Sequence, residues 1–257
     1  MDIPLTEPDL VPSDPNTEET NNNESNTNDD AAKQRPPRDE KYYQDAKQYW
    51  STVSPTVDGM LGGFASISFN DVRGSEQFLR NLYKLKPAPA KLWALDCGAG
   101  IGRVSKSLLM PMFAKVDLVE QDEQFCRTAE NTLAPSGKLG TVFNLGLQDF
   151  TPEEGKYDVI WSQWVLGHLT DDDIVEFFAR CLRGLKKNGL MVLKENFTAG
   201  PHVEPDRQDS SVTRPLPWMK KLLHKGGFRV IKEQKQKDFP KDLYPVYMLA
   251  LKPIINS

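Results

Sequence analysis

The order of apolar runs along the chain is the feature that most restricts its fold. Five short runs have the composition of buried strands: Leu92–Leu95, Val116–Val119, Thr141–Leu145, Tyr157–Trp161 and Leu190–Leu193. Segments with apolar residues at helical spacing, such as Glu123–Leu133, separate most of them. Strands that alternate with helices predict a parallel β-sheet covered by helices on both faces, which is an α/β fold.

The expected helices carry start and stop signals of their own. Aromatic side chains fall on one stripe of Glu40–Trp50, which we expect to form a helical extension before the sheet. Ser75–Leu85 begins with a serine suited to an N-cap. Thr170 and Asp173 have the spacing of a capping box, and we expect the helix that they start to end at the Asn-Gly pair 188–189.

The end of the chain breaks the alternation. Phe228–Glu233 and Val246–Leu251 both have strand composition, and the polar segment between them contains Pro240 and no helical pattern. Without a crossover helix, such strands are expected to pair antiparallel. A mostly parallel seven-stranded sheet with an antiparallel C-terminal strand is typical of the Rossmann-like class I methyltransferase fold, whereas dinucleotide dehydrogenases usually end all-parallel.

Residues 1–40 differ from the rest of the chain. They contain no aromatic residue and carry eleven acidic and three basic residues, a net charge of −8, which leaves +4 for residues 41–257 out of −4 overall. Such a segment cannot bury enough apolar surface to offset the entropy of ordering it. We therefore expect a disordered acidic tail, 1–40, before one folded domain, 41–257. A solvated tail is favoured, and docking on a basic partner is the alternative.

Composition also limits where the protein works. The cysteines Cys97, Cys126 and Cys181 show neither CxxC nor Cys/His spacing, which indicates thiols in a reducing compartment and no metal site. No secretory signal opens the sequence, and no apolar stretch approaches the ~20 residues that span a bilayer. We expect a monomer of the cytoplasm and nucleus, without membrane binding and without direct nucleic-acid binding, because the folded part is only weakly positive.

The most informative local motif follows the first strand. The glycines of Leu95–Arg103 (LDCGAGIGR) stand at the carboxyl end of that strand, where ligands bind in open α/β sheets. Glu120 ends the second strand, twenty-two residues after Gly98, and a carboxylate there can accept both ribose hydroxyls of an adenosine. Gly98, Gly100 and Glu120 therefore predict a cofactor that contains a nucleoside.

Three features favour S-adenosylmethionine over a nicotinamide dinucleotide. The glycines follow GxGxG and not GxGxxG, Asp96 precedes them, and the C-terminal strand pair is expected to be antiparallel. A nicotinamide cofactor stays open as the minor alternative. The fourth strand ends in WSQW at 161–164 and lacks the Asp/Asn-Pro-Pro-aromatic tetrapeptide, which disfavours methylation of adenine or glutamine amines.

Longer motifs resemble those of the eukaryotic protein N-terminal methyltransferases, from about Glu40 to Leu251. The matching segments are YW at 49–50, PTVDGMLGG at 55–63, LDCGAGIGR at 95–103, GLQDF at 146–150, QWVLGHLT at 163–170 and DSS at 209–211. Members of this family methylate the α-amino group of proteins that begin Xaa-Pro-Lys or Xaa-Pro-Arg after removal of Met. The resemblance implies S-adenosylmethionine as cofactor and such protein N-termini as partners.

The resemblance also implies roles for individual residues. The residues implied to bind the cofactor are Gly98, Gly100, Arg103, Glu120, Leu147, Gln148 and Gln163. The residues implied to line a peptide channel are Trp50, Leu61, Ile67, Trp164, Asp206, Ser211 and Tyr244. The residues implied to be catalytic are Asn196, Asp209 and His168. The chain departs from the family at two points, since many members have Asp in place of Glu120 and the loop between Asn196 and Asp209 is one residue longer here.

Each of these residues has a simpler interpretation when taken alone. Trp50 and Trp164 would be core aromatics, His168 a structural histidine, Asn196 a cap or turn residue, and the acidic loop before Asp209 a solvated surface. The surrounding motifs favour the functional interpretation. At the level of the whole protein, the alternatives are a small-molecule methyltransferase and a non-catalytic methyltransferase-like scaffold.

The residue types suit methylation of an α-amine. Displacement at a sulfonium needs a neutral amine held close and aligned. An α-amino group has a pKa of ~7.7–8.0 against ~10.4 for lysine, so modest base assistance suffices near neutral pH. Asp209 and His168 are candidate proton acceptors, and Asn196 can hold the backbone of the first residue. Carboxylates in the channel would attract Lys or Arg at position three, and Trp164 suits proline at position two.

Overall fold

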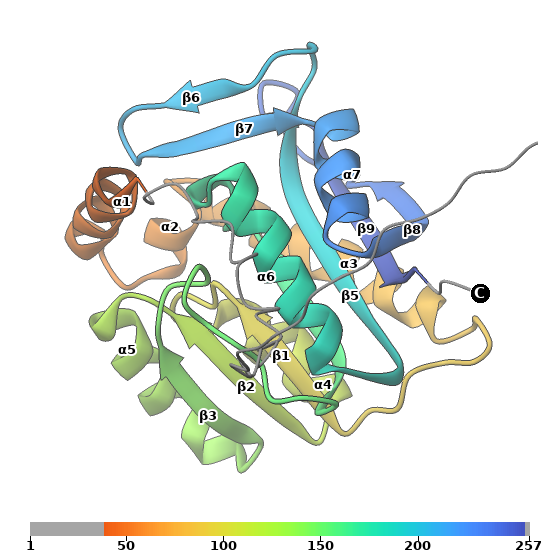
Figure 1. Ribbon diagram of the computed structural model, residues 1–257. Helices are drawn as coiled ribbons and strands as arrows, with labels where there is room; N and C mark the ends of the chain where they lie inside the picture. Colours follow the sequence, from red (N-terminus) through yellow and green to blue (C-terminus); the bar gives the residue numbers. More distant parts are fainter. Residues whose placement is uncertain (1–38, 255–257) are drawn as a thin grey trace, which may run out of the picture. The chain divides into compact units, whose positions relative to one another are not determined.

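The computed structural model describes residues 39–254, so the expected acidic tail lies outside the described residues except for its last two. Asp39 caps the first helix, because its side chain accepts a hydrogen bond from the backbone N–H of Tyr42. Helical segments precede the sheet, as the aromatic stripe at 40–50 predicts (Figure 1). They are α1 (Glu40–Thr52), α2 (Val57–Met60), η1 (Ala65–Ile67) and α3 (Ser68–Leu82).

Seven strands form the central sheet, in the order β3-β2-β1-β4-β5-β9-β8. They are β1 (Trp93–Cys97), β2 (Lys115–Glu120), β3 (Leu139–Asn144), β4 (Tyr157–Gln163), β5 (Leu185–Thr198), β8 (Phe228–Lys235) and β9 (Val246–Pro253). β1 to β5 pair in parallel, and β9 lies antiparallel between β5 and β8. This arrangement confirms the predicted Rossmann-like sheet with its antiparallel C-terminal strand.

Helices cover both faces of the sheet, because successive strand residues point to opposite sides. Leu95 contributes to a core with α6 and α7, whereas its neighbour Ala94 packs with α3, α5 and the segment 104–113. No helix among residues 39–254 is long and apolar enough to cross a bilayer. The covering elements are η2 (Ser105–Leu109), α4 (Met110–Met112), α5 (Glu123–Leu133), η3 (Ala134–Ser136), η4 (Leu166–His168), α6 (Asp171–Gly184) and α7 (Leu216–Lys225).

The structure confirms one predicted helix start and corrects two other predictions. Thr170 caps α6 by accepting a hydrogen bond from the backbone N–H of Asp173 (3.2 Å). Ser75 is not an N-cap, because it lies inside α3 and donates its hydroxyl to a carbonyl one turn earlier (2.9 Å). The helix α6 does not reach 188–189 but ends at Gly184, where Leu185 turns to extended backbone and starts β5.

The structure contains a β-hairpin that the sequence did not predict. It consists of β6 (Glu204–Asp206) and β7 (Ser211–Pro215), which pair antiparallel. Its base joins the end of β5 through two parallel pairs, one of which is Phe197 with Arg214 (Figure 1). Arg214 ties this base to the segment before α6, since its guanidinium donates to the carbonyls of Leu166 (3.0 Å) and Leu169 (2.6 Å). β6 has only three residues, one of them proline, which explains the missing strand signal.

Candidate active site

Two adjoining cavities open at the carboxyl ends of the central strands, and they share Trp50, Met60, Trp164 and His168. The first, which we call the cofactor cavity, is lined by every residue assigned to the cofactor from the sequence: Gly98, Gly100, Arg103, Glu120, Leu147, Gln148 and Gln163. The second, which we call the peptide cavity, is lined by the rest of the assigned residues: Trp50, Leu61, Ile67, Trp164, His168, Asn196, Asp206, Asp209, Ser211 and Tyr244.

The glycine turn after β1 forms a cradle that side chains would fill. Gly98 and Gly100 have φ of 71° and 54°, in the left-handed region that favours glycine. A Cβ atom on Gly98 would lie 2.5 Å from the side chain of Val165, and one on Gly100 would lie 2.7 Å from Sδ of Met60. Position 98 therefore needs glycine both for its backbone conformation and for the space beside it, whereas position 100 needs it for its backbone conformation, since the Met60 side chain can move.

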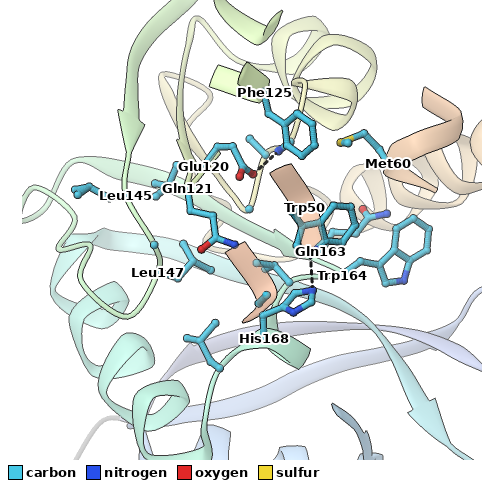
Figure 2. A pocket seen from close by; sticks show the side chains of 18 of the residues that line it. Trp50, Met60, Glu120, Gln121, Phe125, Leu145, Leu147, Gln163, Trp164 and His168 are labelled. Carbon is cyan, nitrogen blue, oxygen red and sulfur yellow. Dashed lines mark hydrogen bonds between the residues drawn. The ribbon is translucent and has the colours of Figure 1, made fainter. Parts of the chain in front are cut away.

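Glu120 lines the cofactor cavity next to this glycine turn, and its carboxylate is fixed by backbone donors. One carboxylate oxygen accepts from the backbone N–H of Gly100 (2.8 Å) and the other from that of Asp122 (2.9 Å). Burial raises the pKa of Glu120, although these backbone donors act in the opposite direction. Figure 2 shows its side chain between Phe125 and Gln121 in the cavity wall. A glycine cradle beside a fixed carboxylate fits the methionine and ribose parts of S-adenosylmethionine.

We expect Glu120→Ala to weaken the binding of S-adenosylmethionine by roughly 1.5–3 kcal/mol, because a charged acceptor of the ribose hydroxyls is lost. Isothermal titration calorimetry with the purified protein measures this change. Glu130→Ala, an exposed position on the neighbouring helix α5, is the matched control. Unchanged affinity in Glu120→Ala would show that the ribose lies elsewhere.

A buried ionic cluster lies beside the cofactor cavity, which two of its members, Arg103 and Gln163, line. We call it the Asp71 cluster: Asp71, Arg103, Gln163 and Lys194. Arg103 lies 2.7 Å from one carboxylate oxygen of Asp71, Gln163 donates to the other (2.9 Å), and the Lys194 ammonium pairs with the same carboxylate. Burial lowers the pKa of Lys194, and the negative charge of Asp71 raises it. Sequence reasoning found Arg103 and Gln163 but missed Asp71 and Lys194, which belong to no recognised motif.

The loop after β3 completes the cofactor cavity. Leu147 is 4% exposed and points into the core, and Gln148 lines the cavity next to it. Arg180, from α6, fixes this loop by donating to the carbonyls of Leu147 (2.8 Å) and Phe150 (2.8 Å). Arg180 lies thirty residues downstream in the middle of a helix, so the sequence offers no signal for this role.

Trp164 forms the wall between the two cavities, in a constrained turn. Its φ is 52°, an uncommon value for a bulky residue, and its backbone N–H donates to the carbonyl of Lys194 (3.0 Å). Glu195 accepts from the next two backbone N–H groups, those of Val165 (2.9 Å) and Leu166 (3.0 Å). Burial raises the pKa of Glu195 to about 7, against these hydrogen bonds. Hydrogen bonds to the end of β5 therefore fix the backbone position of Trp164.

The peptide cavity combines an apolar floor with an acidic rim. Leu61 and Ile67 are buried apolar residues, whereas Asn196 at the end of β5 is exposed. The rim comes from the β6–β7 hairpin, which brings Asp206 and Asp209 to the cavity. One carboxylate oxygen of Asp209 lies 4.0 Å from Nε2 of His168.

Comparisons with known proteins agree with this geometry. The sequence matches the family of AdoMet dependent proline di-methyltransferases over residues 38–252. It is 48% identical to alpha N-terminal protein methyltransferase 1 of Drosophila melanogaster, over 84% of this chain and 78% of that one. It is 47% identical to N-terminal Xaa-Pro-Lys N-methyltransferase 1 of Mus musculus, over 83% of this chain and 97% of that one.

A solved structure with a similar fold supports the same conclusion. It is a SAM-dependent methyltransferase of Leishmania major, with a TM-score of 0.78 and 39% identity, covering 82% of this chain and 83% of that one. The protein is thus an S-adenosylmethionine-dependent methyltransferase, as the glycine spacing and the antiparallel strand indicate. The family match spans nearly all of the described fold, including both cavities, and the chain belongs to the AdoMet dependent proline di-methyltransferase family.

Proposed function

We propose that this enzyme transfers methyl groups from S-adenosylmethionine to the α-amino group of proteins that begin Xaa-Pro-Lys or Xaa-Pro-Arg. The observation that carries the proposal is the junction of the two cavities at Trp164 and His168. A chain end that enters the peptide cavity would bring its terminal amine to this junction. Two relatives support the same substrate class, since the Drosophila protein is named an alpha N-terminal protein methyltransferase and the mouse protein an N-terminal Xaa-Pro-Lys N-methyltransferase.

The lining of the peptide cavity suits each position of such a substrate. Asn196 can hold the backbone of the first residue, and the indole of Trp164 can pack against the ring of a proline at position two. Proline is preorganised, so binding it costs less conformational entropy than binding a flexible residue. Asp206 and Asp209 would attract the cation at position three.

The chemistry needs a neutral amine, and the residues at the junction can provide it. The bound cofactor would supply an electrophilic methyl group on its sulfonium. Burial lowers the pKa of His168, so its imidazole is neutral and can accept a proton. Among the residues that the structure describes, Oδ1 of Asp209 is buried without a hydrogen-bond partner, so it can accept a hydrogen bond from the α-ammonium.

One assay tests this proposal. The protein is incubated with labelled S-adenosylmethionine and the peptides Ser-Pro-Lys-Arg, Ala-Ala-Lys-Arg and N-acetylated Ser-Pro-Lys-Arg. We expect strong methylation of the first peptide, much weaker methylation of the second, and none of the acetylated one, because its α-nitrogen is an amide. Equal labelling of the free and acetylated peptides would point to a side-chain amine and contradict the proposal. Cofactor binding without labelling of any peptide would favour a small-molecule substrate or a non-catalytic role.

A further inference from the structure

The two ring nitrogens of His168 have partners of opposite kinds. The indole N–H of Trp50 lies 3.0 Å from Nε2, a bond marked in Figure 2, and the carbonyl oxygen of Ser210 lies 3.3 Å from Nδ1. An indole N–H can only donate a hydrogen bond, and a carbonyl oxygen can only accept one. Nε2 must therefore carry the lone pair and Nδ1 the proton.

Both partners are held in place by α1. Trp50 lies in the last turn of this helix and meets the His168 ring edge to face, with centroids 5.8 Å apart. Ser210 has φ of 54°, a left-handed conformation, and its hydroxyl donates to the carbonyl of Tyr42 on α1 (3.0 Å). The phenol of Tyr42 donates in turn to the carbonyl of Gly167, the residue before His168. The helix thus fixes the imidazole from both sides.

The charged and titratable groups around the imidazole come from two elements. The β6–β7 hairpin contributes Asp209, 4.0 Å from Nε2, and Asp206, and both carboxylates raise the pKa of His168. α1 contributes Tyr42, whose pKa burial raises to about 12, so that it stays protonated. Burial outweighs the carboxylates and lowers the pKa of His168. The imidazole is therefore neutral in the pH range in which an α-amine is methylated.

We propose that Trp50 and Ser210 are positioning residues that hold His168 as the neutral Nδ1–H tautomer, so that Nε2 is the nitrogen that accepts the proton of the substrate. This inference rests on the proposed function for the identity of the substrate. The α-ammonium displaces the indole N–H from Nε2 and gives its proton to the same lone pair. With S-adenosylmethionine bound, the nitrogen electron pair freed by that transfer would attack the methyl carbon, and the sulfur–methyl bond would break with its electrons staying on the departing thioether.

The tautomer is measured directly by two-bond ¹H–¹⁵N correlation spectra of the ¹⁵N-histidine-labelled protein between pH 5 and 8. His202 and His224 are exposed and serve as internal references. We expect His168 to show the Nδ1–H tautomer and to titrate below the ~6.5 of an unperturbed histidine. An Nε2–H tautomer would overturn the proposal. This measurement needs no substrate. If no peptide were methylated, the proposed function would be contradicted, but the tautomer measured for His168 would stand.

Trp50→Phe keeps an aromatic ring and removes the N–H donor. Since that donor stabilises the neutral ring, its loss should move the titration of His168 to higher pH. The acid limb of the pH profile of kcat/KM should shift to higher pH in the same way. Near pH 6 we expect kcat/KM to fall about fivefold, which corresponds to the loss of one neutral hydrogen bond. At pH 9 the activity should be near normal. Trp218→Phe, which removes an exposed indole donor to Asp171, is the matched control. An unchanged titration of His168 in Trp50→Phe would overturn the assignment of Trp50.

Discussion

Asp209→Asn is expected to lower kcat by about 10²–10⁴-fold, the usual worth of general-base assistance, because Asp209 acts together with His168 in removing the proton. The substitution keeps the shape of the side chain but removes the charge 4.0 Å from Nε2 of His168. Because an α-amino group has a pKa of ~7.7–8.0, raising the pH increases the fraction of substrate that arrives neutral. The rate of the variant should therefore recover in part between pH 7 and pH 9, as steady-state kinetics with a Ser-Pro-Lys-Arg peptide would show.

Asn196→Ala, measured in the same assay, distinguishes the loss of a charged group from the loss of a residue that orients the substrate. Asn196 is exposed in the peptide cavity and its side chain does not ionise near neutral pH, so the activity lost in this variant should not return as the pH rises. If both variants respond to pH in the same way, or if Asp209→Asn keeps a near-normal kcat, Asp209 is not a base. It would then serve only to attract the cationic side chain at position three.

Asp71→Asn should destabilise the folded protein by about 3–5 kcal/mol, because breaking a buried ion pair leaves its partners uncompensated. Asp71 is 1% exposed and faces two buried cations, Arg103 and Lys194. Lys194 is fully buried, and its other bonds go to neutral groups, among them the hydroxyl of Ser75 (2.9 Å). For a domain of this size, such a loss lowers the Tm by about 6–20 °C, which differential scanning calorimetry measures.

Glu76→Gln is the matched control for this experiment, since it removes a carboxylate from the same helix. Glu76 pairs with Arg80 at 2.7 Å, but their side chains are 44% and 66% exposed, so the pair is worth only about 0.3–0.5 kcal/mol. The two variants should therefore differ strongly in Tm. Equal Tm values would mean that water reaches the Asp71 cluster or that the remaining groups rearrange to satisfy Arg103 and Lys194.

The elements that the sequence predicts well are those whose signal is local. Glu123–Leu133 forms α5 with the predicted bounds, since its apolar spacing and the Asp122 cap lie within one segment. Phe228–Lys235 and Val246–Pro253 pair antiparallel, as the absence of a crossover helix predicts. The end of α6 was predicted wrongly because the Asn-Gly pair 188–189 is a strong local stop signal, whereas pairing of β5 with its neighbours is a long-range interaction.

The same distinction between local and long-range signals applies to the candidate site. Gly98 and Glu120 can be located from the spacing of two adjacent strands, and the structure places both in one cavity. Asp71 and Lys194 are 123 residues apart and meet only because α3 packs on β5, so nothing local marks either of them. The partnership of Trp50 with His168 likewise joins segments 118 residues apart. Resemblance to a family brought distant residues into the prediction, but it did not supply these pairings.

The way the β6–β7 hairpin is attached has a consequence for how substrate preference can diverge. The side chain of Trp164 lines both cavities, so exchanging it disturbs the wall that they share. The hairpin meets the sheet through only two residue pairs, yet it delivers Asp206, Asp209 and Ser211 to the peptide cavity. Insertions within residues 199–203, before β6, can therefore change the position of Asp206, whereas Asp209 and Ser210 must keep their places beside His168. Attempts to retarget the enzyme toward a new third residue should begin in this loop.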